Sequence, residues 1–291
     1  MKEIFESLQN ICIEISKYLS KSHSNTYSNN TNTSGDIVHN LDIITNDIFS
    51  DHLSNCPSIF GFASEENDDV NYLNTKNGKY FVVFDPLDGS QNIDVNLSIG
   101  SIFGIFKVDN SLPKSGRYLV ASGYALYGPS TVFVWSTIGQ TNLYKLVGNK
   151  FILDKENIRI PDVGKYYSVN ESNRYRWRND NIRKFFNDQI SLGKSNRWDG
   201  CMVADVHRLL LKGGSFSYPK DEKSKDGKLR LVYECYPMSF IIENSYGFAI
   251  TEDNFQILDI EFPQNIHQKS SILLLGTQEL NNYQNYFSFY P

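Results

Sequence analysis

The sequence has few cysteines, no excess of basic residues and no long apolar run. The cysteines are widely spaced and form no CxxC pair, which argues against a disulfide framework or a zinc site; they are Cys12, Cys56, Cys201 and Cys235. Lys and Arg number 28 against 33 Asp and Glu, so the basic footprint of a nucleic-acid-binding protein is missing. No run could span a bilayer, and the first residues do not form a signal peptide. We therefore expect a cytoplasmic protein with no nucleic-acid or membrane partner.

The remaining composition is that of a globular protein with a large core. The chain has 291 residues, of which 40% are apolar and 21% are charged. This length allows one or two domains. The pattern changes near residues 159–162, which predicts a boundary between an N-terminal domain, 1–160, and a C-terminal domain, 161–291.

Periodicity predicts both helices and strands. Apolar residues at three- and four-residue spacing predict a helix over 3–20 and a second one from about Asp42. Further helices are expected over 180–190, 201–212 and 237–244. Short apolar runs predict strands at 59–63, 79–84, 101–107, 118–126, 131–136 and 143–147. Their spacing favours an antiparallel or mixed sheet over strict βαβ alternation.

A polar tract between the first two helices has no aliphatic residue from Lys21 to Ser34. It cannot bury enough surface to offset its ordering entropy, so we expect it to be mobile. Two interpretations stay open. The tract is either an enlarged surface loop or a lid, the latter because Asp36 and Asp42 follow it directly.

Acidic residues follow two of the predicted strands. The apolar run 80–84 stops at Asp85, with Asp88 three residues later, and Glu65 and Glu66 follow the segment 59–63. If these carboxylates converge, they repel one another unless a divalent cation lies between them. The pattern predicts a magnesium site that holds a phosphate.

A later segment, 228–234, is predicted to be a strand. Its alternation would place Lys228, Arg230 and Glu234 on one face. Such charges are costly to bury unless they meet ligands or partners, and the alternative is an ordinary solvent-exposed face.

Together these motifs resemble a known enzyme family. Glu65-Glu66, DPLDGS at 85–90 and NID at 92–94 resemble the metal-dependent sugar bisphosphatases. The wider lithium-sensitive phosphatases share only the DPLDGS element. The resemblance narrows to the fructose-1,6-bisphosphatase family through SIGSIF at 98–103, CMVADVHR at 201–208 and GKLRLVYEC at 227–235.

This resemblance implies a fold and a metal site. The expected fold is α/β (α+β), a layered α/β/α/β/α sandwich with two mixed sheets. The N-terminal domain would carry the metal-site acids, and the C-terminal domain would bind the sugar phosphate. The expected metal ligands for two or three Mg²⁺ ions, with Mn²⁺ or Zn²⁺ as substitutes, are Glu65, Asp85, the Leu87 carbonyl, Asp88 and Glu234. The expected catalytic residues are Asp42 and Glu66, which would activate the attacking water, and Asp36, which would join as a further ligand when its loop closes.

The resemblance also assigns substrate contacts. Gly89 and Ser90 would offer N–H groups to the scissile phosphate. The second phosphate and the sugar would be bound by Asn170, Arg197, Met202, Tyr218 and Lys228, with Arg230 as a further cation nearby. Arg197 would come from a neighbouring subunit, which implies a homo-oligomer, by family expectation a tetramer. His207 and His267 are expected to be structural.

Some positions depart from the family pattern. Gln91 stands where the family has a small hydroxyl residue, and Asn173 and Trp198 each stand where the family has a tyrosine. Tyr175 is the candidate to replace the tyrosine missing at 173. We expect weaker substrate binding but intact hydrolysis. The AMP-binding region is degenerate: Lys79 and Tyr80 remain, and Lys107 stands in for an arginine. We therefore expect AMP to inhibit poorly.

The sequence therefore predicts Mg²⁺-dependent hydrolysis of the 1-phosphate of fructose 1,6-bisphosphate. Two alternatives remain. One is action on sedoheptulose 1,7-bisphosphate, and the other is a weakly active regulatory protein that binds sugar phosphate.

Overall fold

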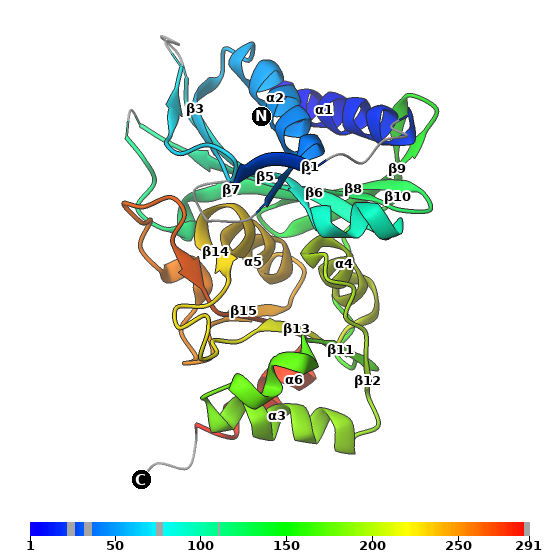
Figure 1. The fold of residues 1–291 in the computed structure, drawn as a ribbon, viewed down its shortest axis with the longest axis vertical. Coiled ribbons are helices and arrows are strands. Elements are labelled where there is room, and N and C mark those ends of the chain that lie inside the picture. The colour runs from blue at the N-terminus through cyan, green and yellow to red at the C-terminus, as the bar shows by residue number, and fades with distance from the viewer. Residues whose placement is uncertain (22–26, 32–36, 74–77, 110, 288–291) are drawn as a thin grey trace.

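The computed structural model describes residues 1–21, 27–31, 37–73, 78–109 and 111–287. Its elements stack in five alternating layers of helices and sheet (Figure 1). This confirms the predicted layered α/β fold with two mixed sheets. In the part of the chain described, no helix combines the length and apolar character that a membrane crossing needs.

Two helices form the first layer, α1 (Lys2–Lys21) and α2 (Asn40–Ser54). The predicted apolar stripe of α1 is fully buried, with Ile4, Leu8, Ile11 and Ile15 all at 0% exposure. Both helices lie on one face of the large sheet and share a core with it (Figure 1).

The large sheet has eight strands in the order β10-β9-β8-β7-β6-β5-β3-β4. Only β3 and β5 pair in parallel; the other neighbours are antiparallel. The strands are β3 (Ile59–Ser64), β4 (Asn71–Tyr72), β5 (Tyr80–Asp88), β6 (Ile99–Lys107), β7 (Leu119–Tyr127), β8 (Thr131–Thr137), β9 (Gln140–Val147) and β10 (Lys150–Lys155). The six strands expected from short apolar runs are confirmed.

The middle layer holds α4 (Met202–Lys212) and α5 (Tyr236–Glu243), which lie between the two sheets (Figure 1). The second sheet has the order β12-β11-β13-β17-β15, with parallel pairing only where β11 meets β12 and β13. Its strands are β11 (Tyr166–Ser168), β12 (Ser195–Asn196), β13 (Ser215–Tyr218), β15 (Phe248–Ile250) and β17 (Ile272–Leu275). The last layer is formed by α3 (Asp180–Ser191) and α6 (Thr277–Gln284).

Two small sheets complete the fold. One pairs β1 (Tyr27–Thr31) with β2 (Ile37–His39), so part of the polar tract is a strand. The rest of that tract, 22–26 and 32–34, lies outside the described residues, as does Asp36, and its lid role stays a prediction. The other small sheet pairs β14 (Leu229–Arg230) with β16 (Lys269–Ser270).

The strand predicted over 228–234 is wrong beyond Arg230. Only Leu229 and Arg230 are extended, and Leu231–Cys235 form a π-helical turn that leads into α5. All five residues of this turn are buried, so the sequence alternation does not reflect one exposed and one buried face. Glu234 consequently lies one turn above Arg230, and its carboxylate accepts the Arg230 backbone N–H at 2.5 Å.

Candidate active site

A bulge in β5 brings Asp85 and Asp88 to the same side. In a regular strand, residues three apart point to opposite faces. Here Asp85 pairs with Ile102 and Asp88 with Gly100, so β5 carries one more residue than β6 over this stretch. Pro86, which has no N–H for the ladder, lies at that point. The Leu87 N–H turns instead to the Asp85 carboxylate at 2.9 Å.

Asp88 is held by the start of α4. Its Oδ2 accepts the backbone N–H of Val203 at 2.7 Å and the thiol of Cys201 at 3.0 Å. The Val203 N–H is one of the donors at a helix N-terminus that has no partner within the helix. Cys201, the N-cap residue, makes no capping bond to the helix itself, so Asp88 caps α4 from the other half of the chain.

Glu234 completes a buried cluster with these two aspartates. One carboxylate oxygen from each of Asp85, Asp88 and Glu234 lies within 4.8 Å of the others. All three side chains are buried. The structure thus brings together acids from β5 and from the π-helical turn before α5, as the sequence predicted.

Burial and mutual repulsion raise the pKa values of these carboxyls. Burial raises the pKa of Asp85 well above its usual value, and the charges of Glu65, Asp88 and Glu234 raise it further. Burial, with a smaller contribution from Glu65, raises the pKa of Asp88 to about 6 and that of Glu234 to about 8. A cation in the cluster would remove the repulsion that raises these pKa values. Three buried hard oxygen donors are the ligand type that divalent Mg²⁺ or Mn²⁺ prefers, so the donor set fits such an ion.

Glu65 lies next to this cluster and is paired with Arg230. An Arg230 guanidinium nitrogen lies 3.1 Å from Glu65 Oε1, and both side chains are nearly buried. The charge of Arg230 also lowers the pKa of Glu234, but burial raises this pKa by more. Arg230, predicted as a cation near the phosphate, is therefore placed between two of the predicted metal ligands.

The remaining catalytic candidates lie in the turn after β3 and in the first turn of α2. Glu66 is half-buried and follows Glu65 in the turn after β3. Asp42 is buried in the first turn of α2. Four residues later on the same helix face, Asn46 hydrogen-bonds Asn67 at 3.0 Å, which places this face of α2 beside the 64–67 turn.

The phosphate-binding candidates sit at the end of β5. Gly89 has a φ of +77° and caps the 3₁₀ turn Ser90–Val95. A Cβ at Gly89 would lie 2.7 Å from the Cβ of Cys201, so only glycine fits between β5 and α4. Ser90 is half-buried. Leu87, which lies between Asp85 and Asp88 in the sequence, is buried.

The sugar-side candidates come from the C-terminal half. Met202 is buried at the start of α4, and Tyr218 is half-buried at the end of β13. Asn170 caps the 3₁₀ turn Glu171–Arg176, and its side chain accepts the Ser172 N–H at 3.2 Å. Lys228 is exposed.

Two positions that depart from the family pattern both contact Tyr218. The side chain of Asn173 hydrogen-bonds its hydroxyl, and the ring of Trp198 meets the tyrosine ring edge-on at 5.7 Å between centroids. Burial raises the pKa of Tyr218. Asn173 and Trp198 thus form one contiguous group around this tyrosine.

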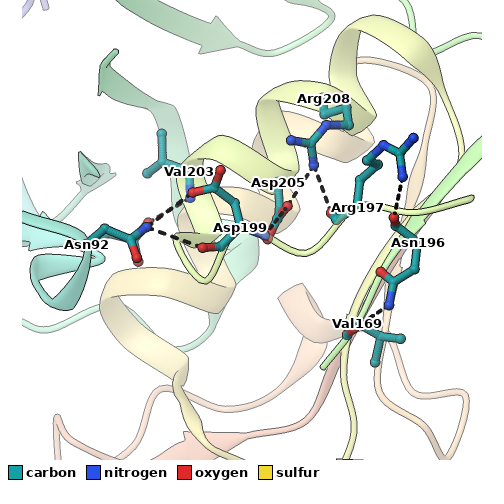
Figure 2. Close-up of polar contacts among 9 residues, drawn as sticks. Asn92, Val169, Asn196, Arg197, Asp199, Val203, Asp205 and Arg208 are labelled. Atoms are coloured by element: carbon teal, nitrogen blue, oxygen red, sulfur yellow. Dashed lines mark hydrogen bonds and ion pairs between the residues drawn. The ribbon is translucent and has the colours of Figure 1, made fainter. Parts of the chain in front are cut away.

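Arg197 points away from the region of Asn92 and its neighbours. Its guanidinium donates to the Asn196 carbonyl at 2.9 Å and lies over the Tyr166 ring at 5.8 Å. Figure 2 shows a hydrogen-bonded network that runs from Asn92 on one side to Arg197 on the other and continues through Asn196 to Val169. Within it, Arg208 donates to the Arg197 carbonyl and to Asp205.

Comparison with known proteins places this geometry in a family. Residues 1–156 match the family model of the fructose-1,6-bisphosphatase N-terminal domain, and residues 160–288 match that of the C-terminal domain. The chain belongs to the fructose-1,6-bisphosphatase family. Because both family models together cover nearly the whole chain, the predicted resemblance is confirmed.

Individual relatives agree with this assignment. A class 1 fructose-1,6-bisphosphatase of Persephonella marina is 39% identical over 265 residues, which is 88% of this chain and 82% of the relative. The cytosolic fructose-1,6-bisphosphatase of Arabidopsis thaliana is 42% identical over 259 residues, or 84% and 75%. The fold is similar to holo Leishmania major fructose-1,6-bisphosphatase, with a TM-score of 0.92, 32% identity and coverage of 98% and 94%.

Proposed function

We propose that the chain hydrolyses the 1-phosphate of fructose 1,6-bisphosphate to fructose 6-phosphate and inorganic phosphate, a step of gluconeogenesis. The observation that carries the proposal is the convergence of Asp85, Asp88 and Glu234 in a member of this family. A buried triad of carboxylates is costly unless a cation lies among them, and a cation held there can bind an anionic substrate.

The proposed cofactor is Mg²⁺, two or three ions per site, with Mn²⁺ or Zn²⁺ as substitutes. The residues that would hold it are Glu65, Asp85, the carbonyl of Leu87, Asp88 and Glu234. When bound, such ions polarise the phosphoryl group and stabilise charge on its oxygens. Arg230, paired with Glu65 at 3.1 Å, holds that carboxylate in place.

The proton chemistry is assigned to acids beside the cluster. Glu66, half-buried in the turn after β3, and Asp42, buried on α2, are the proposed acceptors of the proton from the attacking water. Asp36 is the further proposed contributor. Gly89 and Ser90 would direct N–H groups at the scissile phosphate from the end of β5.

The second phosphate would be bound by residues of the C-terminal half. Asn170, Met202, Tyr218 and Lys228 are the proposed contacts within one subunit. The exposed Arg197 would serve a neighbouring subunit, so a homo-oligomer, by family expectation a tetramer, is proposed.

Three further proposals accompany this function. The first is the division into a metal-binding domain, 1–160, and a sugar-phosphate-binding domain, 161–291. The second is a cytoplasmic location. The third is poor inhibition by AMP. Two residues of the degenerate AMP-binding region, Tyr80 and Lys107, line a cavity of about 440 Å³ together with Lys2 and Phe5 of α1.

An assay of phosphate release tests the function. We expect fructose 1,6-bisphosphate to be cleaved with Mg²⁺ and not in EDTA, and Asp88→Asn to lower kcat/KM by roughly a hundredfold or more, because charge at the cation is lost. The amide can still accept the Val203 N–H, so α4 stays capped. Asp51→Asn, at an exposed position of α2, is the matched control.

The same assay separates the alternatives. A higher kcat/KM on sedoheptulose 1,7-bisphosphate would favour the longer sugar. Binding of sugar bisphosphate without metal-dependent turnover would favour the regulatory alternative and contradict hydrolysis.

A further inference from the structure

Both ring nitrogens of His267 are hydrogen-bonded, which defines its tautomer. Nε2 lies 3.0 Å from the backbone carbonyl oxygen of Asn67. A carbonyl only accepts, so Nε2 carries the proton. Nδ1 lies 2.8 Å from the Tyr233 hydroxyl and therefore accepts from it. Each ring nitrogen of His267 thus has one hydrogen-bond partner.

The two partners of His267 are chain neighbours of a proposed catalytic acid and of a proposed metal ligand. Asn67 directly follows Glu66, and Tyr233 directly precedes Glu234. The ring thus bridges the turn after β3 and the π-helical turn before α5. These two segments belong to different halves of the chain.

The bridge continues to α2. The Asn67 side chain accepts from Asn46 Nδ2 at 3.0 Å, and Asn46 Oδ1 accepts from the Ser64 hydroxyl at 2.6 Å. The same hydroxyl oxygen accepts the Glu66 N–H at 3.2 Å. The 64–67 turn is therefore hydrogen-bonded to Asn46 of α2 on one side and to His267 on the other.

The backbone of His267 is itself anchored. Its N–H donates to the Asn265 side chain at 2.9 Å, and the Leu231 N–H donates to the Gln268 carbonyl at 2.8 Å. Two residues further, β16 pairs with β14. The imidazole is therefore presented from a segment that is already fixed to the start of the π-helical turn.

The Glu65–Glu66 segment needs such an anchor because the negative charge of Glu65 lies beside other carboxylates. Glu65 repels Asp85, Asp88 and Glu234, and its ion-pair partner Arg230 offsets only part of that repulsion at Glu234. We propose that His267 is a positioning residue, which holds the Glu65–Glu66 turn against the segment of Glu234 so that the metal ligands converge before the cation binds. This inference rests on the proposed function, since it assumes that these acids bind metal.

Two conservative variants separate the two hydrogen bonds. Glutamine places an amide near the position of Nε2, and asparagine places one near that of Nδ1. His267→Gln keeps the bond to Asn67, whereas His267→Asn keeps only the bond to Tyr233. We expect His267→Asn to weaken Mn²⁺ binding about tenfold or more, and His267→Gln to stay within about threefold of the parent.

The measurement is direct Mn²⁺ binding to the full chain, followed by the electron paramagnetic resonance signal of the free ion. Phosphate release supplies a second readout. Because the role is in metal binding, His267→Asn should regain most of its kcat at saturating Mn²⁺. A merely structural role would lower kcat at every metal concentration.

The chain offers a matched control in a second tyrosine–histidine pair. The Tyr124 hydroxyl lies 2.8 Å from His207 Nδ1, and this bond joins β7 to α4. Neither element carries a proposed metal ligand. His207→Asn should lower the denaturation midpoint as much as His267→Asn or more, and leave the Mn²⁺ dissociation constant unchanged.

Three results would overturn the inference. His267→Asn could bind Mn²⁺ as tightly as the parent, or both asparagine variants could weaken binding equally. Either result removes the positioning role and leaves the proposed metal site standing. If the parent itself fails to bind Mn²⁺, the metal site and the positioning role both fall.

Discussion

Gly89 occupies a position that no other residue fits without movement. Its φ of +77° lies in the left-handed region, and a Cβ would come within 2.7 Å of the Cβ of Cys201. The close approach matters because Asp88, one residue earlier, caps α4 at Val203. A single side-chain carbon at 89 would therefore separate a proposed metal ligand from the helix that orients it.

We expect Gly89→Ala to lower the free energy of unfolding by about 2–4 kcal/mol, from backbone strain and the displaced contact together. Gly139→Ala is the control, since Gly139 has a φ of +74° but nothing within 4 Å of an added Cβ. It should lose only about 1–2 kcal/mol. Urea denaturation measures both. Equal losses would contradict a steric role for Gly89.

Residue identities around the site were partly readable from the sequence. The acids stand in short local motifs, so Asp85, Asp88 and Glu234 could be named in advance. Their partners could not. The Val203 N–H donates to Asp88, and the His267 ring contacts the Asn67 carbonyl in the turn after β3. Both are contacts between distant segments, which leave no local pattern.

Among the elements, α1 shows how much of the fold depends on one apolar stripe. The helix packs on the large sheet and α2 through residues that are fully buried, Leu8 among them. Leu8→Ala should cost about 2–5 kcal/mol, since it leaves a cavity that rigid neighbours fill poorly. Asn10→Ala, at an exposed position of the same helix, should change the free energy of unfolding by about 0.5 kcal/mol or less.

Guanidinium denaturation distinguishes the two variants. A loss below about 1 kcal/mol for Leu8→Ala would mean that α1 contributes little to the cooperative core.

Elements with a long periodic pattern were predicted well, and short ones were not. The helices α1, α2, α3, α4 and α5 and the strands β3 and β5 to β9 carry enough residues for periodicity to appear. The resemblance implied a second sheet, but periodicity did not locate its strands, because β11, β13, β15 and β17 have only three or four residues each. The 228–234 segment was wrong because every residue of Leu231–Cys235 is buried, and alternation cannot reveal a π-helical turn there.

At the scale of the whole molecule, the buried acids link stability to pH. The folded pKa of Glu234, about 8, lies above its ordinary value of 4.5. Below the ordinary value both states are protonated; between the two values the folded state keeps a proton that the unfolded chain has lost. Stability therefore falls as pH rises through this window. His207, whose pKa burial lowers to about 4, acts in the opposite direction below about pH 6.5.

We therefore expect the Tm of the metal-free protein to fall between pH 7 and 8, where His207 no longer contributes. Glu234→Gln should flatten this slope, and Mg²⁺ should raise the Tm of the parent more at pH 8 than at pH 7. Scanning calorimetry in EDTA and in Mg²⁺ measures both. An unchanged slope in Glu234→Gln would show that other groups cause the pH dependence.

The acids of the cluster come from β5, in the first third of the chain, and from the turn before α5, near its end. During synthesis the ribosome releases Asp85 and Asp88 long before Glu234 exists. A cation can then gain little from an emerging N-terminal half, because a preformed site is what makes binding favourable. Because Glu234 is one of the proposed ligands, the complete site forms only when the second half of the chain has docked, so full metal affinity arises late in the life of each new molecule.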